Sequence, residues 1–360
     1  MKEEEINWHF YLSGRDAWRA MLDACERAEK TIDFEQYVFS DDKISQQFIE
    51  LFRRKQKQGV KVRMLCDTVG GWNLYKSSMP REMREDGVEV RFFNIVSPWR
   101  IRNFFSWFFR DHRKILVIDK SVGFTGGIGI RDDMETWRDT HVKVSGPIVL
   151  EMERVFNELW AQSVEKNFIS RIKRLKTYAK GFHFVTNAPY WRKRFLYYDI
   201  VESIRSAQKY IYLTTPYLVP DSRLMRILRL AVARGVDVRI IVPKKSNMPF
   251  VERASQAHFD PLLQYGVRIF QYHHEFLHAK TAVIDDEWAT VGSFNLDSLS
   301  FLYNYEGNIV STDKTFIDEV KKHFTHDLKY TRELSLEEWR QRPFVAKFRE
   351  WLVMPIKRFL

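Results

Sequence analysis

A long-range internal repeat constrains the fold of this 360-residue chain more than any other feature of its sequence. Four short blocks of the first half return in the second half in the same order: residues 28–32 with 207–211, 59–63 with 235–239, 87–92 with 266–270, and 112–114 with 278–280. Generic strand–helix–strand units can match by chance, but the shared order of four blocks disfavours this alternative. A repeat of this kind predicts two similar halves that face each other across a pseudo-twofold axis.

Each half has the hydrophobic pattern of alternating strands and helices. Strands are predicted at 32–39 and 211–219, helices at 44–58 and 224–234, and further strands in the valine-rich runs 60–65 and 236–242. Each helix ends before a glycine, and continuous apolar strands are typical of a sheet that is covered on both faces. The pattern predicts an α/β fold of two α/β/α halves, with mixed sheets flanked by helices and one active site at their interface.

We expect the first half to span residues 1–180 and the second to span 181–335, followed by a basic segment at 336–360. From Arg340 onward this segment has six Lys or Arg residues and one acid. Its apolar side chains share one helical face: Phe344, Phe348, Trp351 and Leu352. The segment is predicted to be either an interfacial helix, with Trp351 in contact with a membrane, or a helix docked on its own domain.

The net charge of +11 predicts a polyanionic partner, either nucleic acid or an anionic phospholipid membrane. Two isolated cysteines, Cys25 and Cys66, exclude a disulfide framework and disfavour a metal or redox site, so we expect no cofactor. The chain begins Met-Lys-Glu-Glu-Glu, which is not a secretory signal, and no apolar run has the length of a membrane span. We therefore expect a soluble or peripheral protein on the cytoplasmic side of the cell membrane.

One chemical motif, His-x-Lys-x₄-Asp, occurs at corresponding places in the two halves: His112, Lys114 and Asp119, and then His278, Lys280 and Asp285. The apolar, β-branched residues inside each motif predict a strand, on which residues two apart share a face. Histidine and lysine of both motifs are therefore predicted to converge in one pocket. This set supplies a nucleophile, a proton donor and positive charge, which are what the transfer of a phosphodiester requires.

Other residues near the motifs also have predicted roles. Small residues such as Gly127 and Ser293 let a phosphate approach the backbone, and the Asn295 amide can donate a hydrogen bond to it. Asp119 and Asp285 are expected to end their strands and to point away from the phosphate as structural partners.

A histidine nucleophile needs a carboxylate on its other ring nitrogen. Each half offers one candidate, because Asp139 lies 27 residues after His112 and Glu306 lies 28 residues after His278. The alternative is an ordinary surface acid in each case, which the matched spacing disfavours.

These motifs resemble the phospholipase D superfamily and, within it, the bacterial cardiolipin synthases. The resemblance covers nearly the whole chain and includes four stretches: Thr215–Pro220, His112–Gly127, Trp137–Pro147 and Gly292–Glu306. Two positions depart from the usual pattern, since Gly129 replaces an asparagine and Leu299 replaces an arginine. The usual N-terminal pair of transmembrane helices is also absent from this sequence, as in the short type of these enzymes.

The resemblance implies a bilobal enzyme without a metal, in which one chain suffices for one active site. His112 is the implied nucleophile and His278 the implied general acid. A phosphatidyl group then passes from phosphatidylglycerol, through a phosphohistidine, to the alcohol of a second phospholipid. Hydrolysis to phosphatidic acid and metal-independent cleavage of nucleic acid remain alternatives on the same scaffold.

The residues just before the first motif, 98–110, are both aromatic and basic. We expect eight of them to contact a membrane: Trp99, Arg100, Arg102, Phe104, Phe105, Trp107, Phe108 and Phe109. A buried helix edge is one alternative, and a platform that stacks the bases of single-stranded nucleic acid is another. Nucleic acid is the less favoured partner, and the oligomeric state is left open.

Overall fold

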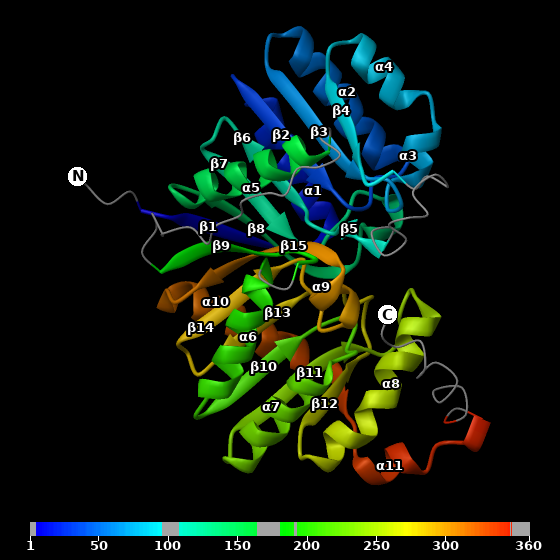
Figure 1. Cartoon of the computed structure of the whole chain (residues 1–360), viewed down its shortest axis with the longest axis vertical. Coiled ribbons are helices and arrows are strands. Elements are labelled where there is room, and N and C mark those ends of the chain that lie inside the picture. The colour runs from blue at the N-terminus through cyan, green and yellow to red at the C-terminus, as the bar shows by residue number, and fades with distance from the viewer. Residues whose placement is uncertain (1–4, 96–107, 164–180, 191–192, 346, 348–360) are drawn as a thin grey trace.

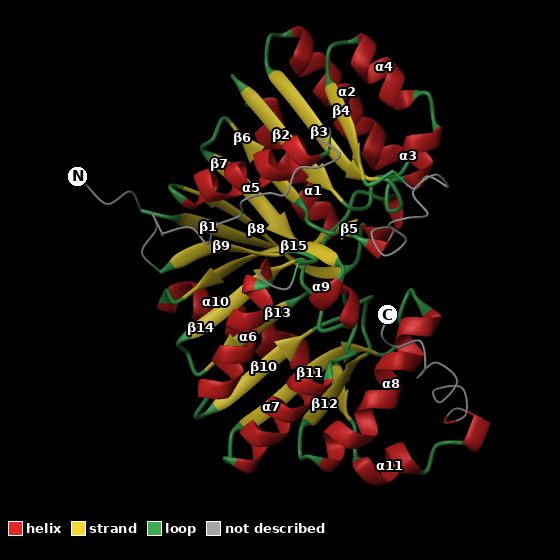
Figure 2. Cartoon of the chain, viewed as in Figure 1, coloured by secondary structure: helices red, strands yellow, loops and turns green. Residues whose placement is uncertain are grey.

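The structure is a computed structural model that describes residues 5–95, 108–163, 181–190, 193–345 and 347. Its two sheets lie one above the other in Figure 1, the first built from the first half of the chain and the second from the second half together with the short strand Arg110–Asp111 of the first half. Helices cover the outer faces of both sheets and also lie between them, as Figure 2 shows by colour. The predicted α/β class, with mixed sheets flanked by helices, is confirmed.

The first half follows the order β1 (Asn7–Ser13), α1 (Gly14–Glu26), β2 (Thr31–Gln36), α2 (Lys43–Lys57), β3 (Lys61–Asp67), α3 (Trp72–Lys76), α4 (Met79–Glu85), β4 (Glu89–Phe93), β5 (Arg110–Asp111), β6 (Ile115–Ile118), β7 (Val122–Gly126), the 3₁₀ helix η2 (Asp132–Met134), β8 (Arg138–Ser145) and α5 (Ile148–Gln162). The predicted helix at 44–58 is α2, and the predicted strands at 32–39 and 60–65 are β2 and β3.

The second half follows the order β9 (Phe182–Asn187), α6 (Phe195–Ser206), β10 (Tyr210–Thr214), α7 (Ser222–Ala233), β11 (Asp237–Pro243), α8 (Pro249–Gln264), β12 (Arg268–Tyr272), β13 (Thr281–Ile284), β14 (Trp288–Gly292), α9 (Ser298–Leu302), β15 (Asn304–Ser311), α10 (Lys314–Leu328), β16 (Thr331–Glu333) and α11 (Leu336–Arg340). Within the basic segment at 336–360, the indole of Trp339 is buried against Phe259 of α8, whereas Phe348, Trp351 and Leu352 lie outside the described residues.

The two sheets have the same strand order. The first runs β4-β3-β2-β6-β7-β8-β1, and the second contains the equivalent run β12-β11-β10-β13-β14-β15, with β9 also paired to β15, β16 added beside β12 and β5 of the first half added beside β15. In both, the first three strands of this run are parallel and the other strands of the run pair antiparallel, whereas β5 pairs with β15 in parallel. The sequence repeat is therefore a repeat of topology, in which β6 and β13 carry the apolar residues of the two His-x-Lys-x₄-Asp motifs.

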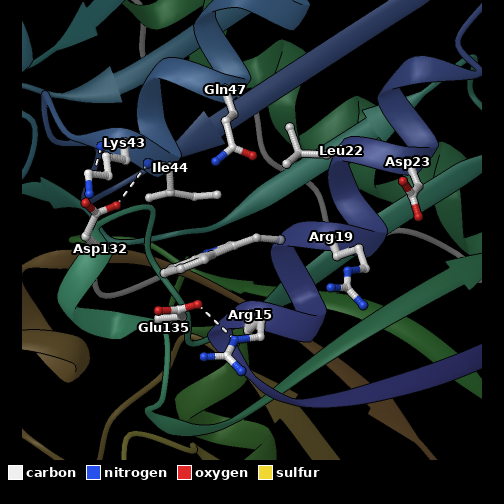
Figure 3. Close-up of a pocket in the computed structure, with 10 residues that line it drawn as sticks. Arg15, Arg19, Leu22, Asp23, Lys43, Ile44, Gln47, Asp132 and Glu135 are labelled. Atoms are coloured by element: carbon white, nitrogen blue, oxygen red, sulfur yellow. Dashed lines mark hydrogen bonds and ion pairs between the residues drawn. The ribbon is translucent and has the colours of Figure 1, made fainter.

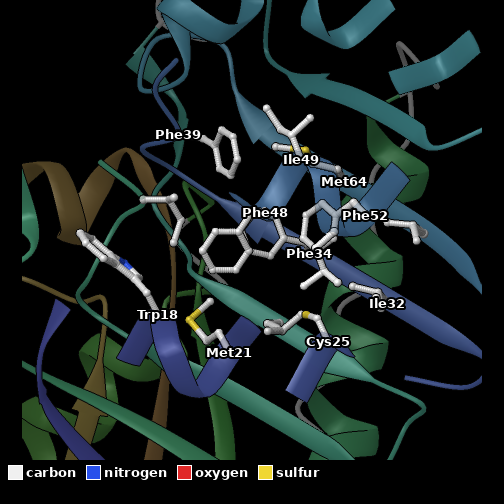
Figure 4. Close-up of a cluster of buried hydrophobic side chains, with 14 of the residues drawn as sticks. Trp18, Met21, Cys25, Ile32, Phe34, Phe39, Phe48, Ile49, Phe52 and Met64 are labelled. Carbon is white, nitrogen blue, oxygen red and sulfur yellow. The ribbon is translucent and has the colours of Figure 1, made fainter. Parts of the chain in front are cut away.

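Three main apolar cores build the layers. In the first half, α1 and α2 cover the outer face of the sheet, where Phe34 of β2 meets Phe48 and Phe52 of α2 with ring centroids 5.7 and 5.2 Å apart (Figure 4). Helices α6, α7 and α8 cover the second sheet in the same way. The third core joins the halves, because side chains of β6 and β8 pack with α5, α10 and the strands of the second sheet.

The aspartates that end the two motifs form matching turns. Asp119 has a φ of 48° and accepts hydrogen bonds from the backbone amides of Glu29, Lys30 and Thr31 at 2.8, 2.7 and 2.7 Å. Asp285 has a φ of 55° and accepts hydrogen bonds from the backbone amides of residues 208, 209 and 210. Both carboxylates therefore hold the start of a neighbouring strand, and they do so in the same way in each half.

Replacing Asp119 by Ala should lower the free energy of unfolding by about 1–3 kcal/mol, since three backbone amides lose a charged acceptor. Burial alone would raise the pKa of the Asp119 carboxyl, but these amides outweigh it and the pKa is lowered. A lowered folded-state pKa stabilises the protein above the unfolded-state value and ceases to do so as the pH falls. Urea unfolding at several pH values should therefore show the loss at neutral pH and a smaller loss below about pH 4.

Asp23→Ala is a matched control for this measurement. Asp23 is an exposed acid of α1 that accepts no backbone hydrogen bond from the part of the chain that the structure describes. An equal loss of stability in both variants would contradict the structural role of Asp119.

Candidate active site

Beside each motif histidine, a backbone hydrogen bond joins the two halves of the chain. The amide of His112 donates to the carbonyl of Tyr305 at 3.0 Å, and the amide of His278 donates to the carbonyl of Arg138 at 2.8 Å. Tyr305 directly precedes Glu306, and Arg138 directly precedes Asp139. Each histidine is thereby held next to a carboxylate of the opposite half.

Both imidazoles use Nδ1 to bind that carboxylate. His112 Nδ1 lies 3.0 Å from each carboxylate oxygen of Glu306, and His278 Nδ1 lies 2.8 Å from Oδ2 of Asp139. All four side chains are at least nine-tenths buried. The sequence nominates Asp139 and Glu306 within their own halves, whereas the structure pairs each with the histidine of the other half. This arrangement fixes the ring tautomers and leaves Nε2 as the atom available for chemistry.

The two motif lysines are also buried beside the histidines. Lys114 Nζ donates to the carbonyl of His112 at 2.6 Å, and Lys280 Nζ donates to that of His278 at 2.5 Å. Lys280 Nζ also lies 3.1 Å from both ring nitrogens of His278. Burial lowers the pKa of Lys114 to about 7 and that of Lys280 to about 8. Both amines are therefore poised to gain a proton when an anion binds.

The histidines and lysines act electrostatically as one site. Burial lowers the pKa of His278 to about 3, and the charges of Lys280 and Lys114 act in the same direction. Burial also lowers the pKa of His112, although Glu306 opposes it, and the charges of Lys114 and Lys280 contribute. Each histidine is thus influenced by the lysines of both motifs, so the two motifs converge across the interface. At neutral pH both rings are uncharged and therefore nucleophilic.

Small and polar residues hold the two carboxylates in place. Ser293 Oγ donates to Glu306 at 2.5 Å, and Ser300 Oγ donates to the same carboxylate at 2.8 Å. Gly127 lies against Asp139, because a Cβ atom at this position would fall 2.5 Å from Oδ1 of that carboxylate. Ser293 and Gly127 thus serve the orienting acids in this structure, and their contact with a substrate phosphate remains a prediction.

Asn295, the third residue predicted to bind the phosphate, is buried. Its backbone amide donates to Ser300 Oγ at 3.2 Å, and its side-chain Oδ1 has no hydrogen-bond partner among the described residues. Its contact with a phosphate also remains a prediction.

Two tyrosines that the sequence analysis did not assign to the site lie against the histidines. The ring centroid of Tyr37, just after β2, is 4.8 Å from that of His112, and Tyr217 is 6.4 Å from His278. Burial raises the pKa of both phenols, and the charge on Tyr37 influences Tyr217. The tyrosines therefore stand close to each other, each beside one of the two histidines.

The first half surrounds its histidine with buried charges that the second half lacks. Arg113 Nε donates to Glu35 at 2.6 Å and lies 3.5 Å from Oδ1 of Asp111. Burial raises the pKa of Glu35, and burial followed by the charge of Glu35 raises that of Asp111 well above its usual range. In the second motif Leu277 and Ala279 take the places of Asp111 and Arg113. The hydrophobic pattern of the sequence does not predict this network of charged residues.

The strand that carries Asp139 is tied to the second half by a buried ion pair. Arg138 makes a two-point contact with Asp327 of α10, at 2.8 and 2.7 Å, with side-chain exposures of 7% and 2%. In the other direction, Tyr305 OH lies 3.3 Å from Oε1 of Gln162 at the end of α5. The residue before each orienting acid thus anchors it to a helix of the opposite sheet or half.

Only two of the aromatic residues predicted to contact a membrane can be placed. Phe108 and Phe109 are partly buried, with ring centroids 6.1 Å from Tyr303 and 6.2 Å from Tyr190. The remaining predicted contacts lie outside the described residues: Trp99, Arg100, Arg102, Phe104, Phe105, Trp107 and Trp351.

A hollow of about 590 Å³ opens on the first half between α1, α2 and η2 (Figure 3). Within it Arg15 pairs with Glu135 at 2.8 Å, and Asp132 accepts hydrogen bonds from the backbone amides of Lys43 and Ile44. None of the predicted site residues lines it.

Within the described residues, no three His, Cys, Asp or Glu side chains are grouped in a way that could hold a metal ion. A search of the same residues for a helix long and apolar enough to cross a membrane finds none.

Two uncharged imidazoles and two amines in one pocket suit an anionic tetrahedral group, and this places the protein among the enzymes that transfer phosphodiesters. The sequence profile of the family described as "Cardiolipin synthase, PLD-like domain" matches residues 21–160 and 200–328. The chain belongs to this family of cardiolipin synthases with phospholipase D-like domains.

Relatives of the chain match along nearly its whole length. A cardiolipin synthase of Halalkalibacterium halodurans is 32% identical over 94% of this chain and 69% of its own length. Cardiolipin synthase A of Pseudomonas entomophila is 32% identical over 91% of this chain and 70% of its own.

Solved structures show the same fold at low identity. The phosphatidylserine synthase of Haemophilus influenzae aligns with a TM-score of 0.71 at 16% identity, covering 98% of this chain and 95% of that one. A polyphosphate kinase of Porphyromonas gingivalis aligns with a TM-score of 0.62 at 13% identity, over 98% of this chain and 53% of its own.

Removing one partner of the Arg138–Asp327 pair should be costly, because the other charge stays buried without its counterion. Asp327→Ala should lower the free energy of unfolding by about 3–5 kcal/mol. The double variant Arg138→Met/Asp327→Leu should recover most of this loss, since it removes both charges and keeps an apolar contact. Urea unfolding of the unmodified protein, the single variant and the double variant measures both effects. A single variant with unchanged stability would contradict the anchoring role.

Proposed function

We propose that this chain makes cardiolipin or a similar diphospholipid by transfer of a phosphatidyl group through a covalent phosphohistidine. Its family makes it a phosphatidyl transferase of the cardiolipin synthase type, an enzyme that acts on phospholipids. The donor is phosphatidylglycerol or a close relative, and the acceptor is the free alcohol of a second phospholipid. The observation that carries the proposed mechanism is the exchange of Glu306 and Asp139 between the two histidines.

In the first step Nε2 of His112 attacks phosphorus, and the bond between phosphorus and the oxygen of the leaving glycerol breaks. Nε2 of His278 takes a proton from the protonated Lys280 and gives it to that oxygen. Lys114 and Lys280 balance the charge on the non-bridging oxygens, and Glu306 stabilises the positive charge that develops on the His112 ring.

In the second step the acceptor alcohol takes the place that glycerol left. His278 accepts the hydroxyl proton and returns it to Lys280, the alcohol oxygen attacks phosphorus, and the bond between phosphorus and Nε2 of His112 breaks. The balance is two molecules of phosphatidylglycerol in, and one of cardiolipin and one of glycerol out. One chain supplies all these groups, so a monomer suffices.

The surroundings of the two rings support the assignment of roles. Lys280 Nζ lies 3.1 Å from Nε2 of His278, so a protonated lysine can supply the proton that a general acid needs. Within the described residues, Nε2 of His112 has no such partner, and its lone pair is available for attack. His112 therefore suits the nucleophile and His278 the acid.

A phosphatidyl ester of p-nitrophenol separates these two roles, because its leaving group needs no proton. His278→Ala should release about one equivalent of nitrophenolate per enzyme in a burst and then stall, since the acceptor is no longer deprotonated. His112→Ala should give no burst. Mass spectrometry of the stalled His278→Ala protein should find the phosphatidyl adduct on His112. A burst from His112→Ala with none from His278→Ala would reverse the assignment.

Purified protein with vesicles of phosphatidylglycerol tests the reaction itself. Cardiolipin and glycerol in equal amounts are expected by mass spectrometry of the products. Phosphatidic acid as the sole product would instead indicate hydrolysis, and cleavage of DNA with no lipid turnover would indicate a nuclease. We place the enzyme at the cytoplasmic surface of an anionic cell membrane, where such a donor is found.

Binding of a diester should also depend on pH through the lysines. An anion among Lys114 and Lys280 raises their pKa values from about 7 and about 8, so binding takes up protons. The affinity for glycerophosphoglycerol, whose diester keeps its charge, should fall by about tenfold between about pH 6 and about pH 9. Calorimetry in buffers of different ionisation heat measures the proton uptake, and an affinity independent of pH would contradict it.

A further inference from the structure

Two loops at corresponding places in the halves reach the rim of the active site. Residues 68–71 follow β3, and residues 244–248 follow β11, which is the equivalent strand of the second sheet. The helices that follow these loops, α3 and α8, both lie at the right of Figure 1. The carboxyl ends of parallel strands meet at one edge of a sheet, so each loop belongs to the edge that bears the motif histidines.

The first loop is one side chain away from His112. Gly70 lies against Tyr37, because a Cβ atom here would be 2.2 Å from the Tyr37 carbonyl oxygen, and the Tyr37 ring packs on His112. Beyond this contact the loop exposes apolar side chains. Val69 is 46% exposed and Trp72, at the start of α3, is 47% exposed.

The second loop has the same relation to His278. Asn247 Oδ1 accepts a hydrogen bond from the Tyr217 hydroxyl at 2.7 Å, and the ring of Tyr217 faces that of His278. Two large apolar side chains are exposed here, Met248 at the end of the loop at 47% and Phe250 in the first turn of α8 at 60%. Exposed apolar side chains therefore lie beside both tyrosines: Val69 is next to Gly70, which contacts Tyr37, and Met248 is next to Asn247, which contacts Tyr217.

The charged side chains around these exposed apolar residues are positive. Lys76 Nζ lies 4.8 Å from the ring centroid of Trp72, and Lys244 and Lys245 open the second loop. Residues 68–76 and 244–250 contain no acid. The nearest acid of α8, Glu252, accepts the backbone amide of Ser246 at 2.8 Å and is thereby engaged within the loop. Apolar side chains with lysines beside them match a bilayer whose surface is negative.

We propose that Val69 and Trp72 on one side, and Met248 and Phe250 on the other, form a docking surface for an anionic lipid bilayer, with Lys76, Lys244 and Lys245 at the headgroups. The inference rests on the proposed function, because the phosphate of a bilayer lipid must reach the buried histidines through this rim. The two apolar sides enter the interface together and set the pocket over a headgroup, so the substrate needs to rise only a short way from the bilayer.

Flotation with vesicles of phosphatidylglycerol and phosphatidylcholine tests the surface. Trp72→Gln/Phe250→Gln should bind at least about tenfold more weakly than the unmodified protein, since two large side chains no longer enter the interface. Lys244→Gln/Lys245→Gln should lose about fivefold or more at low salt, and nothing on vesicles of phosphatidylcholine alone.

The chain offers matched controls on other faces. Leu150 of α5 is 51% exposed and Leu230 of α7 is 41% exposed, and each is an isolated apolar residue on a helix surface. Leu150→Gln/Leu230→Gln should bind vesicles as the unmodified protein does. An equal loss in this control, or unchanged binding by Trp72→Gln/Phe250→Gln, would overturn the proposal.

A dispersed short-chain phosphatidylglycerol separates docking from catalysis. On this soluble substrate Trp72→Gln/Phe250→Gln should keep the unmodified kcat/KM, and on vesicles it should lose activity in step with binding. If the unmodified protein binds vesicles through these residues but transfers no phosphatidyl group, the proposed function fails and the docking surface stands. The opposite result is that both loop variants bind vesicles as the unmodified protein does but lose binding to a single-stranded oligonucleotide. That result would overturn the proposal in favour of a nucleic-acid surface.

Discussion

The rest of the site depends on one constraint, which is that each motif histidine takes its carboxylate from the opposite half. Glu306 and Asp139 bind Nδ1 of His112 and His278, and backbone hydrogen bonds from both histidines to the residue before each acid set the distance. Neither half can therefore orient its own imidazole. Docking of the halves and assembly of the site are the same event, and the apolar core between the sheets, with α5 and α10 inside it, supplies its stability.

This arrangement buries six ionisable groups, two histidines, two lysines and two carboxylates, and its electrostatics follow from that. Burial disfavours the charged forms of Lys114 and Lys280, so their pKa values fall to about 7 and about 8. The carboxylates remain ionised although burial alone would raise their pKa values. His112 and Ser293 outweigh burial and lower the pKa of Glu306. His278 and Lys280 do the same for Asp139. A bound anion would raise both lysine pKa values, because it stabilises the protonated amines. The substrate phosphate thus completes a charge balance that the protein leaves open.

The repeat and the two motifs were sufficient to predict the α/β class, the converging histidines and the structural role of Asp119. They could not predict that each acid binds the histidine of the opposite half. The spacings of 27 and 28 residues are the same whether an acid binds the histidine of its own half or of the other. Tyr37 was missed for a related reason: the block at 28–32 aligns it with Pro216, one residue before Tyr217. The strands of the motifs also begin later than the pattern predicts, at Ile115 and Thr281, so both histidines lie on the segments that enter the strands.

A duplicated fold does not require duplicated chemistry, and the residues that flank the two histidines differ. Asp111 and Arg113 fix the backbone around His112, since the Asp111 amide donates to Asp67 at 3.0 Å and Arg113 binds Glu35. Leu277 and Ala279, which flank His278 in the sequence, are instead buried in an apolar cluster with Ile241, Phe270 and Phe324. A ring that bonds to phosphorus must keep its line of attack through both steps, whereas a ring that carries a proton must serve a departing and an arriving oxygen in turn. A rigid charged frame suits the first task, and an apolar setting with Lys280 beside the ring suits the second.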